Sequence, residues 1–329
     1  MKHNPRVVRH NGSATRRLRP PRRRPGAPAA DRADWRPGRL AAVTSSAAEP
    51  TSATPRLTIV VLHAHPDDET SQTAGIMALA ARDGHRVVTV FATDGNHGQR
   101  PEELGPDGDL VEHRRSEARA SARVLGTARI DWLGYRDSGM TGWPQNDDPR
   151  CLHRADLDEA AGRLARILDR EDADVLIGYD HHGIYGHPDH IAVHRIGARA
   201  VELAARRPRL LEATQNQDAQ VAMLERPEVS ELFAQFEAAG SDVAELREMI
   251  LEGDDGQIVG VPEADIAWAI ELPDDVIALK REAMACHASQ TSDIGLMLAL
   301  PENIYALAFG TEYLVEPGSD QPMRRARPF

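Results

Sequence analysis

Two clusters of imidazole and carboxylate side chains each follow an apolar segment of this chain. The first cluster, residues 65–69, reads HPDDE and comes directly after the apolar segment 57–62. The second cluster comprises His187, Asp189 and His190. Imidazole and carboxylate groups together suit a divalent transition metal, and catalytic zinc sites usually combine three protein ligands with one water. The two clusters therefore predict a metal site that activates water.

The order of residues in the first cluster suggests different tasks for neighbouring side chains. His65 and Asp68 can supply two metal ligands, and Asp67 lies between them. If the backbone turns sharply after the strand, Asp67 faces the attacking water and acts as its general base. The alternative is that these acids only favour the positive end of a helix that starts near Thr70. A helix start, however, requires neither a histidine nor three consecutive acids.

Two predicted strands must bring the clusters together. The segments 57–62 and 173–179 are continuous apolar runs, which is typical of parallel strands that are buried on both faces. Ligands bind at the carboxyl edge of such sheets, so the second cluster is expected to supply a third metal ligand, His190. Gly183 and Gly186 allow the backbone before this cluster to bend. The sequence thus predicts an α/β fold with a Rossmann-like, mostly parallel sheet and flanking helices.

The two motifs, HPDDE at 65–69 and GHPDH at 186–190, together resemble those of the PIG-L (LmbE-like) family of zinc N-deacetylases. That family includes GlcNAc-phosphatidylinositol de-N-acetylases and the deacetylase and amidase of the mycothiol pathway. The resemblance extends over residues 57–316. It implies the LmbE-like fold, in which C-terminal strands and a helix complete the domain.

The resemblance implies hydrolysis of an N-acetyl or similar N-acyl group on a small-molecule amino sugar or amino-sugar conjugate. One Zn²⁺ per chain is expected on His65, Asp68 and His190, and these residue types also suit Fe²⁺. The ion would lower the pKa of a water, and Asp67 would remove its proton. Pocket-rim loops decide the exact substrate, so inositol-linked glucosamine, a mycothiol-type conjugate, a chitooligosaccharide and an antibiotic precursor all stay open.

The family pattern also implies roles for three residues around the second motif. Tyr185 would stabilise the tetrahedral oxyanion together with the metal. Protonated His187 would neutralise developing charge or protonate the leaving amine. Asp189 would orient a histidine, most simply His187, through a hydrogen bond. The alternative is that His187 and Asp189 only cap the start of a helix.

Two further residues are expected to bind the sugar on the basis of this resemblance. Arg114 belongs to an R-x-x-E pattern with Glu117 and would hold substrate hydroxyls, whereas the alternative is a helical ion pair on the surface. Asp137, in the RDSGM loop 136–140, would accept a hydrogen bond from a sugar hydroxyl or simply cap a turn. His287, in a closing H-x-S-Q segment, is expected either near the site or in helix packing.

The chain divides into three expected parts. Residues 1–55 are rich in Arg, Pro and Ala and hold 12 Lys/Arg against 3 Asp/Glu, so they should form a disordered tail. Residues 56–317 should form the deacetylase domain, in which the Ala-rich stretch 71–83 is predicted to be one helix. A helical insertion is expected at about 206–256, where it would cap the site or form an oligomer contact. Residues 318–329 are expected to be a flexible C-terminal tail.

Charge and cysteine content argue against several other classes of protein. The net charge is −12, and outside residues 1–55 it is −21, so the folded domain is not expected to bind nucleic acid. Two cysteines cannot form a disulfide framework, which favours a reducing compartment. No apolar run reaches the roughly 20 residues of a membrane span, and the N-terminus lacks the apolar core of a secretory signal. A cytoplasmic location is therefore predicted.

Three other functions fit parts of the sequence. A catalytically silent, metal-dependent protein that binds sugar conjugates would keep the same cleft, but it would have no use for Asp67 as a base. A nucleotide-binding Rossmann domain should have G-x-G-x-x-G after its first strand, where this chain has HAHPDDE. The Arg-rich tail could bind nucleic acid or an anionic membrane through its charge.

Overall fold

The structure, a computed structural model, describes residues 55–253 and 255–329. The predicted disordered tail lies outside these residues, except for Pro55. None of the helices in this part of the chain has the length and apolar character that a membrane span requires.

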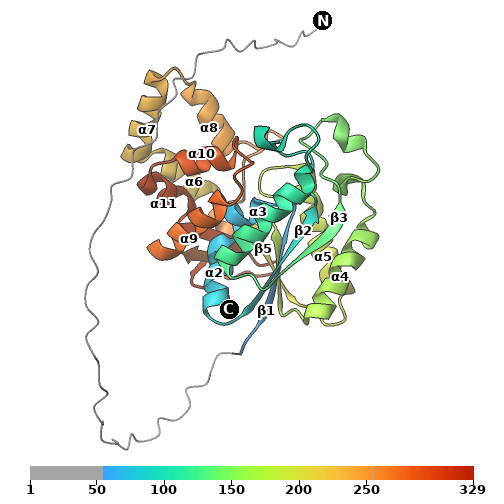
Figure 1. Cartoon of the computed structure of the whole chain (residues 1–329). Coiled ribbons are helices and arrows are strands. Elements are labelled where there is room, and N and C mark those ends of the chain that lie inside the picture. The colour runs from blue at the N-terminus through green and yellow to red at the C-terminus, as the bar shows by residue number, and fades with distance from the viewer. Residues whose placement is uncertain (1–54, 254) are drawn as a thin grey trace, which may run out of the picture. The chain divides into compact units, whose positions relative to one another are not determined.

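A mixed sheet forms the centre of the fold. Its strands are β1 (Thr58–His63), β2 (Arg86–Thr93), β3 (Arg129–Tyr135), β4 (Val175–Tyr179), β5 (Arg209–Thr214), β6 (Trp268–Glu271), β7 (Thr311–Val315) and β8 (Arg324–Arg325). They follow the order β3-β2-β1-β4-β5-β7-β6-β8. Figure 1 shows β1, β2, β3 and β5 among the surrounding helices. The pairs from β3 to β5 are parallel, β7 is antiparallel to β5 and β6, and β8 is parallel to β6. This sheet confirms the predicted mostly parallel α/β fold.

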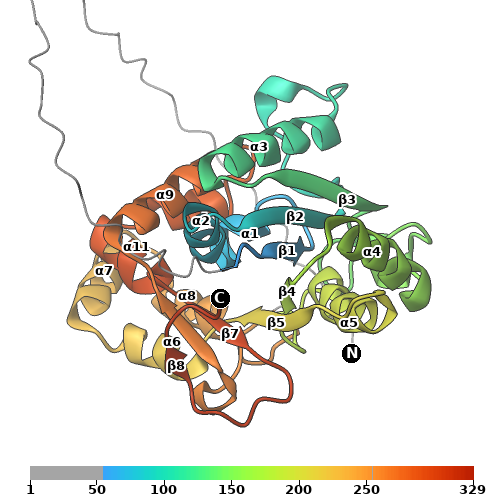
Figure 2. The same cartoon turned by 90° about the horizontal axis from the view of Figure 1, so that it is seen from below.

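Helices cover both faces of the sheet. They are α1 (Asp68–Gln72), α2 (Ala74–Arg82), α3 (Leu110–Leu125), α4 (Leu157–Glu171), α5 (Pro188–Leu203), α6 (Gln217–Leu224), α7 (Pro227–Ala238), α8 (Val243–Leu251), α9 (Asp274–Ala285), α10 (Ile294–Ala299) and α11 (Glu302–Phe309). Figure 2 shows α2, α3 and α9 on one face, whereas α4 and α5 cover the other. Because both faces are covered, every residue of β1 from Ile59 to His63 is buried, as its unbroken apolar sequence predicts.

The predicted single helix at 71–83 is instead two helices that meet at Thr73. The backbone of Thr73 has φ −142° and ψ 5°, outside the helical region, so the hydrogen-bond ladder is interrupted there. Glu312 on β7 accepts hydrogen bonds from the N–H groups of Gly75 and Ile76, at 2.8 and 2.7 Å. A carboxylate that satisfies the free N–H groups of a helix start stabilises that start. A residue more than 200 positions away therefore decides where α2 begins.

The segment 206–256 differs from the predicted helical insertion, because its first part, β5, is a central strand of the sheet. The helices of this segment are α6, α7 and α8. Together with α11 they enclose a small apolar core of their own, formed by Leu224, Val229, Leu232, Phe233 and Ile304. The strand carries Arg209 and Glu212 among its apolar residues, which interrupts the strand pattern in the sequence.

The C-terminal residues also differ from the predicted flexible tail over 318–329. Arg324 and Arg325 pair with β6 as the edge strand β8. The ring of Phe329 packs edge-on against His85, with 5.9 Å between the ring centroids. These contacts join the end of the chain to both the edge of the sheet and the start of β2.

Candidate active site

The two predicted clusters meet at the carboxyl ends of the parallel strands. His65 follows β1 directly, and His187 and His190 lie at the start of α5, after β4. The ring centroids of these three histidines are 4.8 to 5.4 Å apart. All three residues are buried. The parallel topology thus brings together imidazoles that are more than 120 positions apart in the sequence.

The three predicted metal ligands lie together, with the two histidines next to one carboxylate oxygen of Asp68. Oδ2 of Asp68 lies 3.5 Å from Nδ1 of His65 and 3.4 Å from Nε2 of His190. The backbone N–H of His65 also donates to this oxygen, at 2.8 Å. Two buried imidazole nitrogens beside a buried carboxylate form a donor set that suits Zn²⁺ or another small divalent transition metal.

Two further groups of possible ligand atoms share His65. Ligand atoms of His65, His187 and His190 all lie within 4.8 Å of one another, and so do those of His65, Asp137 and Asp189. The donor atoms of the site therefore converge on His65 from both halves of the parallel sheet.

Asp67 occupies the sharp turn that the sequence required. Its backbone has φ 132° and ψ −32°, a region that residues other than glycine rarely adopt. Its N–H donates to Oε2 of Glu69 at 3.0 Å, and its Oδ2 accepts from Nη2 of Arg114 at 2.9 Å. Burial raises the pKa of Asp67 to about 6, although the positive charge of Arg114 opposes this shift.

Arg114 lies beneath the first cluster and is only 2% exposed. Its Nη1 donates to the carbonyl of Gly95 at 2.7 Å, and its Nη2 donates to the carbonyl of Pro66 at 2.6 Å. A Cβ atom added at Gly98 would lie 2.2 Å from Nη1, so the guanidinium fills the space next to this glycine. These contacts, together with Asp67, use both terminal nitrogens of Arg114 within the protein.

The expected helical pair between Arg114 and Glu117 is replaced by two longer-range contacts. Glu117 accepts hydrogen bonds from the N–H and the hydroxyl of Ser289, at 2.8 and 2.7 Å. Arg114 turns instead towards Asp67. Arg114 therefore links α3 to the first cluster, and Glu117 links α3 to the chain after α9.

His187 is the N-cap of α5, and its Nδ1 accepts a hydrogen bond from the N–H of Asp189 at 3.1 Å. Burial lowers the pKa of His187 to about 3, and the neighbouring imidazoles of His65 and His190 act in the same direction. The resting side chain is therefore neutral, in contrast to the protonated form expected from the resemblance. His187 therefore both caps α5 and lies next to the predicted metal ligands His65 and His190.

The carboxylate of Asp189 contacts a different histidine from the one expected. Its Oδ2 lies 3.2 Å from Nε2 of His65, whereas only its backbone N–H meets His187. The same carboxylate accepts from the N–H of Ser138 at 2.8 Å and from the Ser138 hydroxyl. Asp189 thus fixes the ring of His65 and ties it to the loop after β3.

Asp137 is buried and serves two neighbours. Its Oδ1 accepts from the N–H of Gly139 at 2.8 Å and lies 3.5 Å from Nε2 of His65. Its Oδ2 accepts from the N–H of His97 at 3.4 Å. Burial favours a higher pKa, but the facing charge of His65 holds the pKa of Asp137 below its ordinary value. Asp137 therefore caps a turn and also faces the predicted metal site.

Tyr185 closes the other side of the site. Its hydroxyl lies 3.3 Å from Nε2 of His190. It follows Ile184, whose φ of 72° is unfavourable for a β-branched residue. The chain after α8 covers this loop: Asp255 lies 3.0 Å from Nε2 of His182, and the N–H of Gly260 donates to the carbonyl of Ile184 at 2.6 Å.

A buried chain of polar side chains behind Asp68 was not predicted. The Tyr179 hydroxyl lies 2.9 Å from Nδ1 of His63, and Nε2 of His63 lies 3.1 Å from Oγ1 of Thr73. Burial raises the pKa of Tyr179, and the charge of Asp68 and a hydrogen bond to it act in the same direction. The only signal in the sequence is the polar end of each apolar run, at His63 and Tyr179.

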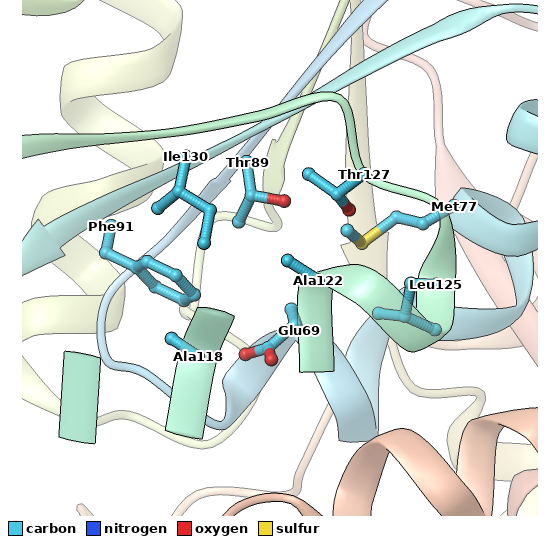
Figure 3. Close-up of a pocket in the computed structure, with 9 residues that line it drawn as sticks. All are labelled: Glu69, Met77, Thr89, Phe91, Ala118, Ala122, Leu125, Thr127 and Ile130. Carbon is cyan, nitrogen blue, oxygen red and sulfur yellow. The ribbon is translucent and has the colours of Figure 1, made fainter. Parts of the chain in front are cut away.

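Glu69 and His287 also belong to the surroundings of the site. Oε1 of Glu69 lies 2.7 Å from Nε2 of His287 and accepts from the hydroxyl of Ser121 at 2.6 Å. Glu69 borders a narrow pocket that has no room for a water molecule (Figure 3). The other residues that line it are mostly apolar, among them Phe91 and Leu125. None of the predicted site residues lines this pocket, so it lies behind the site and is not the place where substrate would react.

Similarity to known proteins agrees with this geometry. Residues 60–201 match the family model described as PIG-L, GlcNAc-PI de-N-acetylase. A 1D-myo-inositol 2-acetamido-2-deoxy-alpha-D-glucopyranoside deacetylase from Thermomonospora curvata is 37% identical over 268 residues, which cover 78% of this chain and 88% of that protein. A deacetylase of the same name from Geodermatophilus obscurus is 36% identical over 276 residues, which cover 79% and 92% of the two chains.

Solved structures support the fold. The crystal structure of the A40926 pseudoaglycone deacetylase Dbv21 superposes with a TM-score of 0.51 at 16% identity, over 80% of this chain and 97% of that chain. At this identity the similarity concerns the fold alone. The long matches to relatives of more than 30% identity establish the family, and the chain belongs to the PIG-L family of N-deacetylases.

Proposed function

We propose that this N-deacetylase hydrolyses the N-acetyl amide of an inositol-linked N-acetylglucosamine, the type of compound named for its relatives from Thermomonospora curvata and Geodermatophilus obscurus. The observation that carries the proposal is the convergence of His65, Asp68 and His190 beside Asp67. Such an arrangement combines a metal site with a neighbouring acid that is not one of the proposed ligands.

His65, Asp68 and His190 would hold one Zn²⁺, and Fe²⁺ suits the same ligands. The ion, when bound, supplies a Lewis acid that polarises the amide carbonyl and lowers the pKa of water. Asp189 keeps the ring of His65 in place through its 3.2 Å contact with Nε2. Tyr179 supports Asp68 from the opposite, buried side. Groups of this kind around a ligand normally strengthen metal binding.

Asp67 would take the proton from the attacking water. It is the carboxylate next to the ligand set that is paired with an arginine, Arg114, and not with one of the three imidazoles. The paired guanidinium favours the ionised form of the carboxylate, which is the form a base requires. Arg114 would therefore act mainly on Asp67 and less on the sugar hydroxyls.

His187 and Tyr185 would act on the side of the departing amine and the oxyanion. A neutral His187 can accept a proton during the reaction and pass it to the leaving nitrogen. The Tyr185 hydroxyl, which lies next to His190, would donate a hydrogen bond to the oxyanion. Asp137, on the loop after β3, would accept a hydrogen bond from a sugar hydroxyl near His65.

The test is the release of free amine from inositol-linked N-acetylglucosamine, followed by mass spectrometry. Wild-type protein should release acetate and amine in equal amounts, and simple N-acetylglucosamine should react more slowly. Faster turnover of a chitooligosaccharide would replace the proposed substrate. Absence of release from a broad panel of N-acetyl amino sugars would contradict the proposal and favour a binding protein.

The two cysteines of the chain, Cys151 and Cys286, are both free thiols in the structure. Free thiols are typical of proteins that work in a reducing compartment. On this ground we place the reaction in the cytoplasm.

A further inference from the structure

The backbone of Asp67 requires support from its surroundings. A non-glycine residue with φ 132° and ψ −32° is strained, and such a conformation persists only where neighbouring groups hold it. Arg114 binds the side chain of Asp67, and Glu69 accepts its backbone N–H at 3.0 Å. The carbonyl of Asp67 accepts from the N–H and the hydroxyl of Thr70, at 2.9 and 2.7 Å.

Glu69 is itself fixed by two donors that come from distant parts of the chain. The carboxylate is 2% exposed. Its Oε1 accepts from the hydroxyl of Ser121 on α3 and lies 2.7 Å from Nε2 of His287, just after α9. With Oε2 engaged by the N–H of Asp67, each oxygen of Glu69 has a partner within the protein.

The residues around His287 connect this carboxylate to the helix that carries Arg114. Ser289 binds Glu117 on α3 through both its N–H and its hydroxyl. Gln290 accepts from the N–H of Gln99 at 3.0 Å and donates to its carbonyl at 3.1 Å. Residues 287–290 therefore contact Glu69 directly, and they contact α3, the helix that carries Arg114.

Glu69 has mostly apolar neighbours on the side that borders the pocket of Figure 3, so few other polar groups there could replace these partners. A buried pair adds little to net stability, since the attraction between its partners is largely offset by the loss of solvation. The arrangement is thus better suited to fixing a geometry than to stabilising the fold.

We propose that Glu69 and His287 are positioning residues, which hold the backbone of Asp67 so that its carboxylate faces the reacting water. The inference rests on the proposed role of Asp67 as the base. Neither residue touches substrate in this scheme. Their effect on the reaction passes through the N–H of Asp67.

The test compares three variants of His287 in the full-length, zinc-loaded protein. His287→Gln retains a donor near the position of Nε2, His287→Asn places its donor nearer to Nδ1, and His287→Ala has none. Because a misplacement of about 1 Å costs on the order of 100-fold in rate, kcat of the Ala and Asn variants should fall by roughly that factor. The Gln variant should recover most of kcat, while KM and zinc content stay within about twofold in all three.

Two controls separate positioning from general damage. His85 is also buried and accepts a hydrogen bond from the N–H of Leu57, but it lies at the far end of β1. His85→Ala should lower the melting temperature and leave kcat unchanged. If His287→Ala does not fold, Glu69→Gln serves as the second variant, because it keeps the shape but replaces one acceptor oxygen by a donor. Its kcat should fall by the same factor.

A crystal structure of zinc-loaded His287→Ala, or of Glu69→Gln, provides a readout that does not need activity. The φ angle of residue 67 should leave the positive region. An unchanged φ, a loss of zinc that accounts for the lower rate, or a Gln variant as slow as the Ala variant would each overturn the inference. An inactive wild-type protein would instead contradict the proposed function, and the crystal structure would still test the positioning role.

Discussion

The two sides of the site are held in different ways. On the base side, Asp67 is supported by Arg114 and Glu69, each 2% exposed. On the loop side, residues 182–186 carry Tyr185 and are covered by the chain after α8. The ion pair that joins the two segments there, His182 with Asp255, involves an Asp255 side chain that is 24% exposed.

Both sides contain a strained residue, so the difference lies in the support. Asp67 has φ 132° and Ile184 has φ 72°. Buried partners hold both residues, since Asp180 accepts the N–H of Ile184 at 2.9 Å, but the segment that covers Ile184 carries the partly exposed Asp255. We therefore expect substitutions on the base side to affect the reaction more than substitutions in the chain after α8.

The largest expected effect comes from the base side. Asp67→Asn should lower kcat/KM by about 10² to 10⁴-fold, the usual contribution of a general base. Zinc content should stay at one ion per chain, since Asp67 is outside the proposed ligand set. Steady-state kinetics and elemental analysis measure the two quantities. Asp320→Asn, at an exposed position, is the control. A larger loss from Tyr185→Phe than from Asp67→Asn would reverse the comparison between the two sides.

Removal of the metal tests the proposed metal site, on which both sides of the active site depend. Dialysis against a chelator should reduce amine release to background and lower the melting temperature, because an ion that binds only the folded state stabilises it. Added Zn²⁺ should restore both quantities in wild-type protein. His190→Ala should not respond to Zn²⁺, whereas His85→Ala should respond like wild type. Full activity in the chelated protein would contradict the proposed metal site.

A smaller effect is expected on the loop side. A partly exposed ion pair contributes about 1 kcal/mol or less. Asp255→Asn should therefore lower kcat/KM by roughly tenfold at most, with unchanged zinc content. Glu252→Gln, a neighbouring charge change, is the matched control for kinetics. If Asp255→Asn lowered the rate as much as Asp67→Asn, the loop side would be as tightly constrained as the base side.

The smallest expected effect is a pH-dependent change in stability on the loop side. The hydrogen bond to Glu212, 3.0 Å from Nδ1, raises the pKa of His194 on α5. A raised folded-state pKa stabilises the fold below the unfolded pKa of about 6.5, and this contribution is lost as the pH rises through the folded value.

His194→Gln should therefore lower the melting temperature more at about pH 6 than at about pH 9. The loss of free energy of unfolding should be below about 1 kcal/mol, which corresponds to less than roughly 4 °C. Thermal unfolding at both pH values measures it, with His153→Gln as an exposed control. A difference that grew with pH would show that the pair with Glu212 does not stabilise the protein.

Local sequence patterns were enough to predict the two strands that carry the site. The apolar runs that end in HPDDE and before GHPDH predicted buried parallel strands, and β1 and β4 are the neighbouring central strands of the sheet. Parallel strands of one sheet present their carboxyl ends at one edge, so residue types at the ends of these strands were enough to predict that His65, Asp68 and His190 would meet.

Only the tertiary structure decided which partners the polar groups take. Arg114 binds Asp67 and not Glu117, Asp189 fixes His65 and not His187, and Glu69 meets His287 from 218 positions away. Each choice depends on how helices pack over the sheet, whereas periodicity reports only which face of an element is buried. The strands β5 and β8 were missed because charged residues interrupt the apolar pattern of β5 and because β8 consists only of Arg324 and Arg325, whose place is fixed by pairing with β6.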